Sequence, residues 1–306
     1  MIGTAASGTL RALRTSALVA RCGLLTAMFL SLVACGGASV PDAGRDAARA
    51  EEDAGDDAGP HDAGLPSDAV ILSAYHGLDM LPARANFLCG GTDVEGDDGM
   101  PLVFSVQLTM ASVTADAFRV ETADGSPVTP TCATLAPAVE ARERRTVLLA
   151  GPFGTPDAPP RAVEVVGDLR DADGRSLTGL RIESIVTLAE GASLALVERF
   201  EPGTAGFEGE CPAGAQILQL TWEGGVSGPG GAPLGDAQRT GIEVTVQGEE
   251  VVIPAALGDD DPDNHVVACV NDWRPATSVS VTAGLFHDPG DDANPATDAE
   301  VMAGVL

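Results

Sequence analysis

The sequence predicts an all-β fold, with two β-sandwich domains at residues 69–204 and 205–306 that follow a signal peptide and a disordered acidic linker. From Asp68 onward, short runs of apolar and β-branched residues alternate with Gly, Pro, Asp and Asn. This spacing is typical of β-sandwiches, and no long amphipathic helical pattern interrupts it. The folded part has about 235 residues, which is more than one sandwich usually needs.

The apolar runs define the expected strands. Asp124-Gly125 lies between the second and third runs and predicts a hairpin, because glycine readily adopts the positive φ of tight turns. Residues 136–145 are the helical alternative, although Pro137 and a run of charges favour a loop there equally. The expected strands are 102–109, 117–122, 128–134, 146–150, 162–166, 181–188, 193–200, 215–222, 241–247, 250–253, 265–270 and 278–283. A stretch rich in Gly, Pro and Glu at 201–212 sets the expected domain boundary.

Residues 1–34 have the pattern of a signal peptide. They contain Arg11, Arg14 and Arg21 but no acid, and their apolar run, 22–34, is too short to span a bilayer comfortably. The run ends in Leu32-Val33-Ala34-Cys35, which resembles the lipobox of bacterial lipoproteins. The resemblance implies acylation of Cys35, a membrane anchor and a cell-envelope location. Gly36 after the cysteine favours the outer membrane, and an ordinary signal peptide that contains a cysteine is the alternative.

Residues 35–68 are predicted to be a disordered tether. They repeat Asp-Ala-Gly and contain almost no large apolar side chain, so little burial could offset the entropy of ordering them. A weak cation-binding tail is the alternative function for this segment. Removal of residues 1–34 takes away three arginines and no acid, so the formal net charge falls from −28 to −31. Such a charge repels phosphate backbones, and we expect no nucleic-acid partner.

Four cysteines remain after Cys22 is cleaved away and Cys35 is acylated. An oxidising compartment favours disulfides between them over a metal–thiolate site, and no C-x-x-C spacing supports zinc. Four thiols allow three pairings. Because the expected boundary places two cysteines in each domain, the preferred pairs are Cys89 with Cys132 and Cys211 with Cys269.

Residues 112–180 contain two turn motifs in sequence: Phe118-Arg-Val with Asp124-Gly125-Ser-Pro-Val128, and later Asp171-Ala-Asp173-Gly174-Arg-Ser-Leu177. This pattern resembles the bacterial Ig-like modules of S-layer and surface proteins. The resemblance covers under a third of the chain. It implies a non-catalytic structural, adhesive or ligand-binding ectodomain with a protein or glycan partner at the cell surface, and it carries over no catalytic residue.

Two acidic loops form the candidate metal site. If the strands at 265–270 and 278–283 paired as a hairpin, the loops before and after them would face each other, and calcium would suit their oxygens. Asn264 stands where an EF-hand loop has glycine, so the pattern is not an EF-hand. Two solvated acidic loops without metal are the favoured alternative. The candidate calcium ligands are Asp259, Asp261, Asp263, Asp288, Asp291 and Asp292.

A secreted hydrolase or lyase with an active site built from loops is the rival function. The sequence has no G-x-S-x-G or H-E-x-x-H motif, and His76, His265 and His287 are the histidines of the folded region. A triad assembled from distant loops would leave no local signature. Among the aromatic residues, Trp222 alternates with leucines and is expected in the core. Trp273, in a turn, is the better candidate for an exposed aromatic that contacts carbohydrate, although a position folded over the end of a sandwich is favoured.

Overall fold

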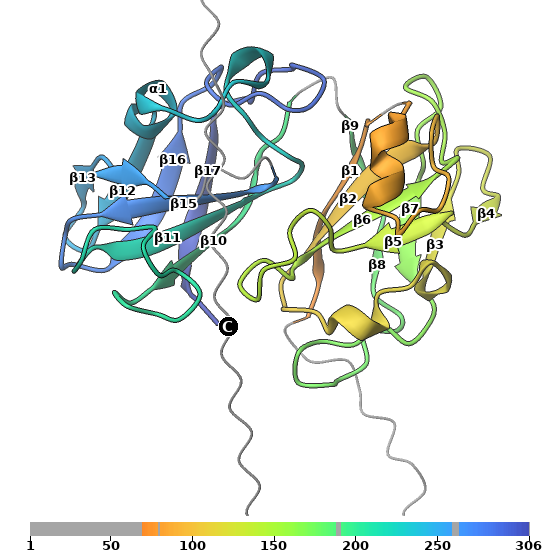
Figure 1. The fold of residues 1–306 in the computed structure, drawn as a ribbon, viewed down its shortest axis with the longest axis horizontal. Helices are drawn as coiled ribbons and strands as arrows, with labels where there is room; N and C mark the ends of the chain where they lie inside the picture. The colour runs from red at the N-terminus through yellow and green to blue at the C-terminus, as the bar shows by residue number, and fades with distance from the viewer. Residues whose placement is uncertain (1–68, 79, 188–190, 259–262, 306) are drawn as a thin grey trace, which may run out of the picture. The chain divides into compact units, whose positions relative to one another are not determined.

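The structure is a computed structural model that describes residues 69–78, 80–187, 191–258 and 263–305. It confirms the all-β prediction, with strands throughout and only short helical turns (Figure 1). The predicted signal peptide, Cys35 and the acidic tether lie outside the described residues. The helical elements are η1 (Ala83–Phe87), η2 (Met110–Ser112), η3 (Ala115–Ala117), η5 (Pro229–Gly231) and α1 (Asp236–Thr240).

Two sheets form the first sandwich. The first has the strand order β5-β6-β2-β1-β9 and the second β4-β3-β7-β8. All their pairs are antiparallel except β1 with β9. The strands are β1 (Ile71–His76), β2 (Asp98–Phe104), β3 (Phe118–Glu121), β4 (Pro127–Val128), β5 (Cys132–Thr134), β6 (Thr146–Gly151), β7 (Ala162–Val165), β8 (Arg181–Ile182) and β9 (Val186–Thr187).

The core of the first sandwich follows the two-residue period of its strands. Leu102 and Phe104 of β2 and Leu149 of β6 contribute to one apolar cluster, together with Phe118 and other side chains of the second sheet. Ala150, the next residue of β6, belongs instead to a smaller cluster around the first disulfide. Both faces of this central antiparallel strand pair are therefore covered, which explains why β2 and β6 are buried along their whole length.

The Asp124-Gly125 turn confirms the predicted hairpin. Val120 pairs with Val128 across β3 and β4, and Gly125 has φ 86°. The carboxylate of Asp124 accepts hydrogen bonds from the Thr122 hydroxyl at 2.6 Å and the Ser126 N–H at 2.9 Å. Local turn chemistry thus closes this hairpin without tertiary help.

The second sandwich is one eight-stranded sheet curled into a half-barrel, with the order β13-β12-β16-β17-β10-β11-β15-β14. Residues 297–300 of β17 pair with β16, and residues 301–303 pair in parallel with β10. β17 therefore joins the two halves of the eight-stranded sheet. The end strands β13 and β14 are short and follow each other in the chain. The strands are β10 (Leu194–Phe200), β11 (Gln216–Trp222), β12 (Ile242–Val246), β13 (Glu250–Val252), β14 (Ala256–Leu257), β15 (His265–Val270), β16 (Ala276–Val281) and β17 (Thr297–Ala303).

Trp222 anchors the core of the second sandwich, as predicted. It is fully buried together with Leu218 and Leu220, and its ring packs on Phe286 with 4.6 Å between the ring centroids. Trp273, in contrast, is 90% exposed, so the expectation that it folds over the end of the sandwich is wrong. The turn that carries it is held instead by Arg274, which donates to Asp272 and Glu250.

Two further expectations change with the strand pairing. β10, expected in the first domain, pairs with β11 and β17, so the passage between the sandwiches falls before Leu194 rather than at 204/205. β15 pairs with β11 and β14, and β16 pairs with β12 and β17, so the expected hairpin between β15 and β16 does not form. Residues 136–145 form a loop with turns rather than a helix.

Both predicted disulfides form. Cys89 is bonded to Cys132 with a Cα–Cα distance of 5.9 Å, and Cys211 to Cys269 with 5.4 Å. The first bond ties the loop after η1 to β5, and the second ties the 201–215 loop to β15. Each sandwich therefore carries one bond.

Candidate functional site

Buried charges concentrate where residues 140–146, which end the loop between β5 and β6 and begin β6, contact the second sandwich. We call this contact the seam. Arg142, Glu143 and Arg145 are each less than 9% exposed, and so is Glu198 on β10 of the second sandwich. Charged side chains are rarely buried unless they are paired. The charged side chains of the seam are therefore expected to be paired with one another.

Arg145 and Glu198 form a buried, two-pronged ion pair across the seam. Nε of Arg145 donates to Oε2 of Glu198 at 2.8 Å, and Nη2 donates to Oε1 at 2.5 Å. Nη1 donates to the Ser105 carbonyl at 2.7 Å. This fork-to-fork geometry is the strong form of an arginine–carboxylate contact and fixes the orientation of both partners.

Arg142 contacts both sandwiches. Its Nη2 lies 3.1 Å from Glu143 Oε1 and 3.0 Å from Glu210 Oε1, and Nη1 donates to the Gly206 carbonyl at 2.7 Å. The guanidinium lies over the Phe207 ring, 5.1 Å from its centroid. The 201–215 loop of the second sandwich thus closes over an arginine of the first.

A group of three carboxylates lies beside Arg142, and we call it the seam cluster. One oxygen from each of Glu140, Glu143 and Asp263 lies within 4.8 Å of the others. Burial, and secondarily the contact with Glu140, raises the pKa of Glu143 to about 10. The same contact lowers the pKa of Glu140. Asp263 accepts a hydrogen bond from the His265 N–H at 2.7 Å, which orients it at the start of β15.

Further contacts extend across the two sandwiches. The Tyr75 hydroxyl on β1 donates to Asp288 Oδ2 at 2.8 Å, and Asn264 donates to the Thr146 hydroxyl at 2.8 Å. Both bonds are buried. Each bond joins a residue of the first sandwich to a residue of the second. The two sandwiches are therefore bonded to each other at several separate points.

The two acidic loops of the predicted calcium site are described only in part. Asp259 and Asp261 lie outside the described residues, and Asp263 belongs to the seam cluster. Asp288 uses Oδ1 to accept from the N–H groups of Gly290 and Asp292 and Oδ2 to accept from Tyr75. Asp291 accepts from Gly230 N–H and His287, and these bonds lower its pKa. The side chains of Asp288 and Asp291 are engaged in these bonds, and within the described part of the chain Asp288, Asp291 and Asp292 do not form a group of converging ligands.

His265 and His287 make their contacts within the second sandwich. His265 is 2% exposed between Gln219 and Thr221, and burial, followed by the charge of Arg142, lowers its pKa to about 3. His287 contacts Asp291 at 2.8 Å, an arrangement a hydrolase could use. Ser227, its neighbour across a bridge, donates its hydroxyl to the Gly228 carbonyl at 3.1 Å rather than to the imidazole.

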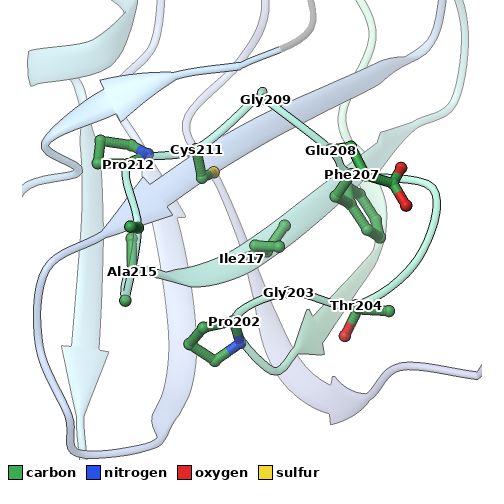
Figure 2. A pocket seen from close by; sticks show the side chains of 12 residues that line it. Pro202, Gly203, Thr204, Phe207, Glu208, Gly209, Cys211, Pro212, Ala215 and Ile217 are labelled. Carbon is green, nitrogen blue, oxygen red and sulfur yellow. The ribbon is translucent and has the colours of Figure 1, made fainter.

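A small cavity of about 150 Å³ lies in the 201–215 loop and is shown in Figure 2. Ile217 on β11 lies between Phe207 and Pro202 there, and Cys211 forms part of the lining. Ligand sites usually enclose about 300 to 1,000 Å³ and include several converging polar groups. The cavity is consequently a packing gap behind the second disulfide rather than a binding site.

No protein-family model matches the chain, and no curated protein is detectably similar to it in sequence. Within the described residues, no helix has the length and apolar character needed to cross a membrane. Sequence reasoning missed Glu140, Arg142, Glu143 and Glu198. The available signal was the charged run at 140–145, which the sequence leaves open as either a helix or a loop.

Tyr75 provides an optical test of the contact with Asp288, since it is the single tyrosine of the chain. Burial and the Asp288 carboxylate raise its pKa well above the ordinary value of 10. Folded protein should show no tyrosinate absorbance at 295 nm between pH 10 and 11. An unfolded chain does ionise there, so this contribution to stability is complete below pH 10 and is lost above it, by up to about 1.4 kcal/mol per pH unit. Ionisation near pH 10 without loss of circular dichroism would contradict the contact.

Proposed function

We propose that this protein is a lipid-anchored component of the cell envelope, held in the outer membrane through acylated Cys35. Its ectodomain is a non-catalytic pair of β-sandwiches with a structural, adhesive or ligand-binding role, similar to that of bacterial Ig-like surface modules. The acidic residues 36–68 serve as the tether between membrane and ectodomain.

The cysteine pattern carries this proposal. Cys89, Cys132, Cys211 and Cys269 all lie in the two disulfides. Disulfides persist in extracytoplasmic compartments and are rare in a reducing cytosol. A cysteine that follows an apolar leader and stands apart from these pairs fits a lipidation site.

The geometry of the polar residues supports a non-catalytic role. His265 and Asp288 are engaged in internal hydrogen bonds, and Ser227 donates to carbonyl oxygens. Trp273, nine-tenths exposed beside Arg274, is the described aromatic best placed to contact a protein or glycan. Exposed aromatic and arginine side chains are common at recognition surfaces.

Metabolic labelling with radioactive palmitate tests the anchor. The full chain should incorporate label and fractionate with outer membranes, and Cys35→Ser should abolish both. Cys22→Ser is the matched control, because it changes a leader cysteine that the mature protein lacks, and it should leave labelling intact. Undiminished labelling of Cys35→Ser would refute the proposal. Hydrolase activity that His287→Ala removes would favour the enzymatic rival.

A further inference from the structure

We propose that the seam cluster binds one calcium ion, shared by Glu140 and Glu143 of the first sandwich and Asp263 of the second. The site differs from the two acidic loops that the sequence suggested, with which it has Asp263 in common. It does not depend on the lipid anchor.

The spacing of the oxygens suits calcium. Calcium binds oxygen ligands at about 2.3 to 2.6 Å, so two ligands on opposite sides of the ion lie roughly 5 Å apart and adjacent ligands lie closer. The candidate oxygens of Glu140, Glu143 and Asp263 fall within 4.8 Å of one another. All three are hard carboxylate oxygens, with no sulfur or imidazole among them, which favours calcium over zinc. Carbonyl oxygens and water commonly complete such a shell.

The unsatisfied oxygens of Glu143 give an independent argument for a bound cation. Its side chain is 1% exposed, and no described N–H or O–H group donates a hydrogen bond to either of its carboxylate oxygens. The ion pair with Arg142 reaches Oε1 at 3.1 Å, and Arg142 divides its charge between Glu143 and Glu210. Burying a carboxyl group whose oxygens accept no hydrogen bond is costly, and a bound cation would satisfy them.

The charge balance points in the same direction. Glu140, Glu143, Asp263 and Glu210 bring four carboxyl groups to this region, and the Arg142 guanidinium contacts Glu143 and Glu210. A divalent cation bound between the three cluster oxygens would favour the ionised form of all three groups. Because its ligands come from both sandwiches, the ion would also fasten the second sandwich to the 140–146 segment.

Calcium titration of the detergent-solubilised full chain tests the site. Isothermal titration with calcium chloride should give one ion per chain. Extracellular calcium modules bind with dissociation constants near 10⁻⁴ to 10⁻³ M. Saturation with 10 mM calcium should therefore raise the melting temperature by roughly 3 to 10 °C relative to EDTA.

Isosteric variants locate the site. Glu143→Gln and Asp263→Asn should abolish the calcium-dependent shift, and half-buried Glu140→Gln should weaken binding at least tenfold. The matched control Asp291→Asn/Asp292→Asn neutralises two acids of the exposed loop and should bind as the parent does. Circular dichroism in EDTA checks the folding of every variant. Glu140→Gln keeps the test decisive if a fully buried variant unfolds.

Two results would overturn the proposal. The first is an unchanged melting temperature and no binding heat with up to 10 mM calcium chloride. The second is calcium binding that survives Glu140→Gln and Glu143→Gln but is lost in Asp291→Asn/Asp292→Asn, which would place the ion in the exposed loop.

Discussion

Replacement of Arg145 by methionine is expected to lower the free energy of unfolding by about 3 to 5 kcal/mol. The substitution leaves Glu198, whose side chain is 2% exposed, as a buried carboxylate without its guanidinium partner. It also removes the donor to the Ser105 carbonyl. Urea unfolding, followed by tryptophan fluorescence, measures the loss. Trp222 is a suitable reporter because it lies in the core of the second sandwich.

Two companion variants distinguish the cost of an unpaired buried charge from the cost of losing an arginine side chain. Arg145→Met/Glu198→Leu removes both charges and should recover most of the loss, since apolar replacement of a buried pair is often neutral or stabilising. Arg181→Met breaks a half-exposed pair with Glu121 at 2.8 Å and should cost under about 1 kcal/mol. If Arg145→Met cost no more than Arg181→Met, the seam would not hold the two sandwiches together.

Removal of either disulfide is expected to destabilise the protein by about 4 kcal/mol in the chain-entropy model. Cys89–Cys132 spans 43 residues and Cys211–Cys269 spans 58, and each bond restricts the unfolded chain over that length. Paired serine variants, Cys89→Ser/Cys132→Ser and Cys211→Ser/Cys269→Ser, measured by urea unfolding, test this. Parent protein unfolded in dithiothreitol is the control for both bonds together.

The two bonds should differ through packing rather than loop length, because loop entropy grows only logarithmically with chain length. Cys269 is fully buried in the cluster with Ile217 and Phe207, and Cys89 is only partly buried. A hydroxyl at 269 therefore adds an unsatisfied polar group, so the second pair should cost more. A loss below about 1 kcal/mol for either pair would contradict the prediction.

Local chemistry made much of the fold predictable. The Asp124-Gly125 hairpin depends on residues within one turn, and Trp222 lies in an alternating apolar pattern that fixes its face. β17 was not predicted because its positions are only half-buried or exposed and carry Asp298 and Glu300. It forms a strand because β16 and β10 supply hydrogen-bond partners on its two sides, and no local pattern encodes those partners.

The seam escaped prediction for a related reason. Glu143 and Arg145 belong to a charged run that would be solvated in isolation, and they are buried because the second sandwich covers them. Glu198 lies 53 residues from Arg145, and Asn264 lies 118 from Thr146. The aspartates near 259–263 and 288–292 form a dense local pattern, but Tyr75, one of the hydrogen-bond donors to Asp288, lies 213 residues away, and no local pattern encodes that contact.

The ends of the eight-stranded sheet have a consequence for behaviour at high concentration. β13 and β14 have three and two residues, and residues 253–255 carry the chain directly from one to the other. Exposed strand edges offer unpaired N–H and C=O groups that can template edge-to-edge association. Because both edge strands of this sheet are short, a neighbouring copy could form few backbone hydrogen bonds with them. Concentrated protein should therefore resist fibrous aggregation through this sheet.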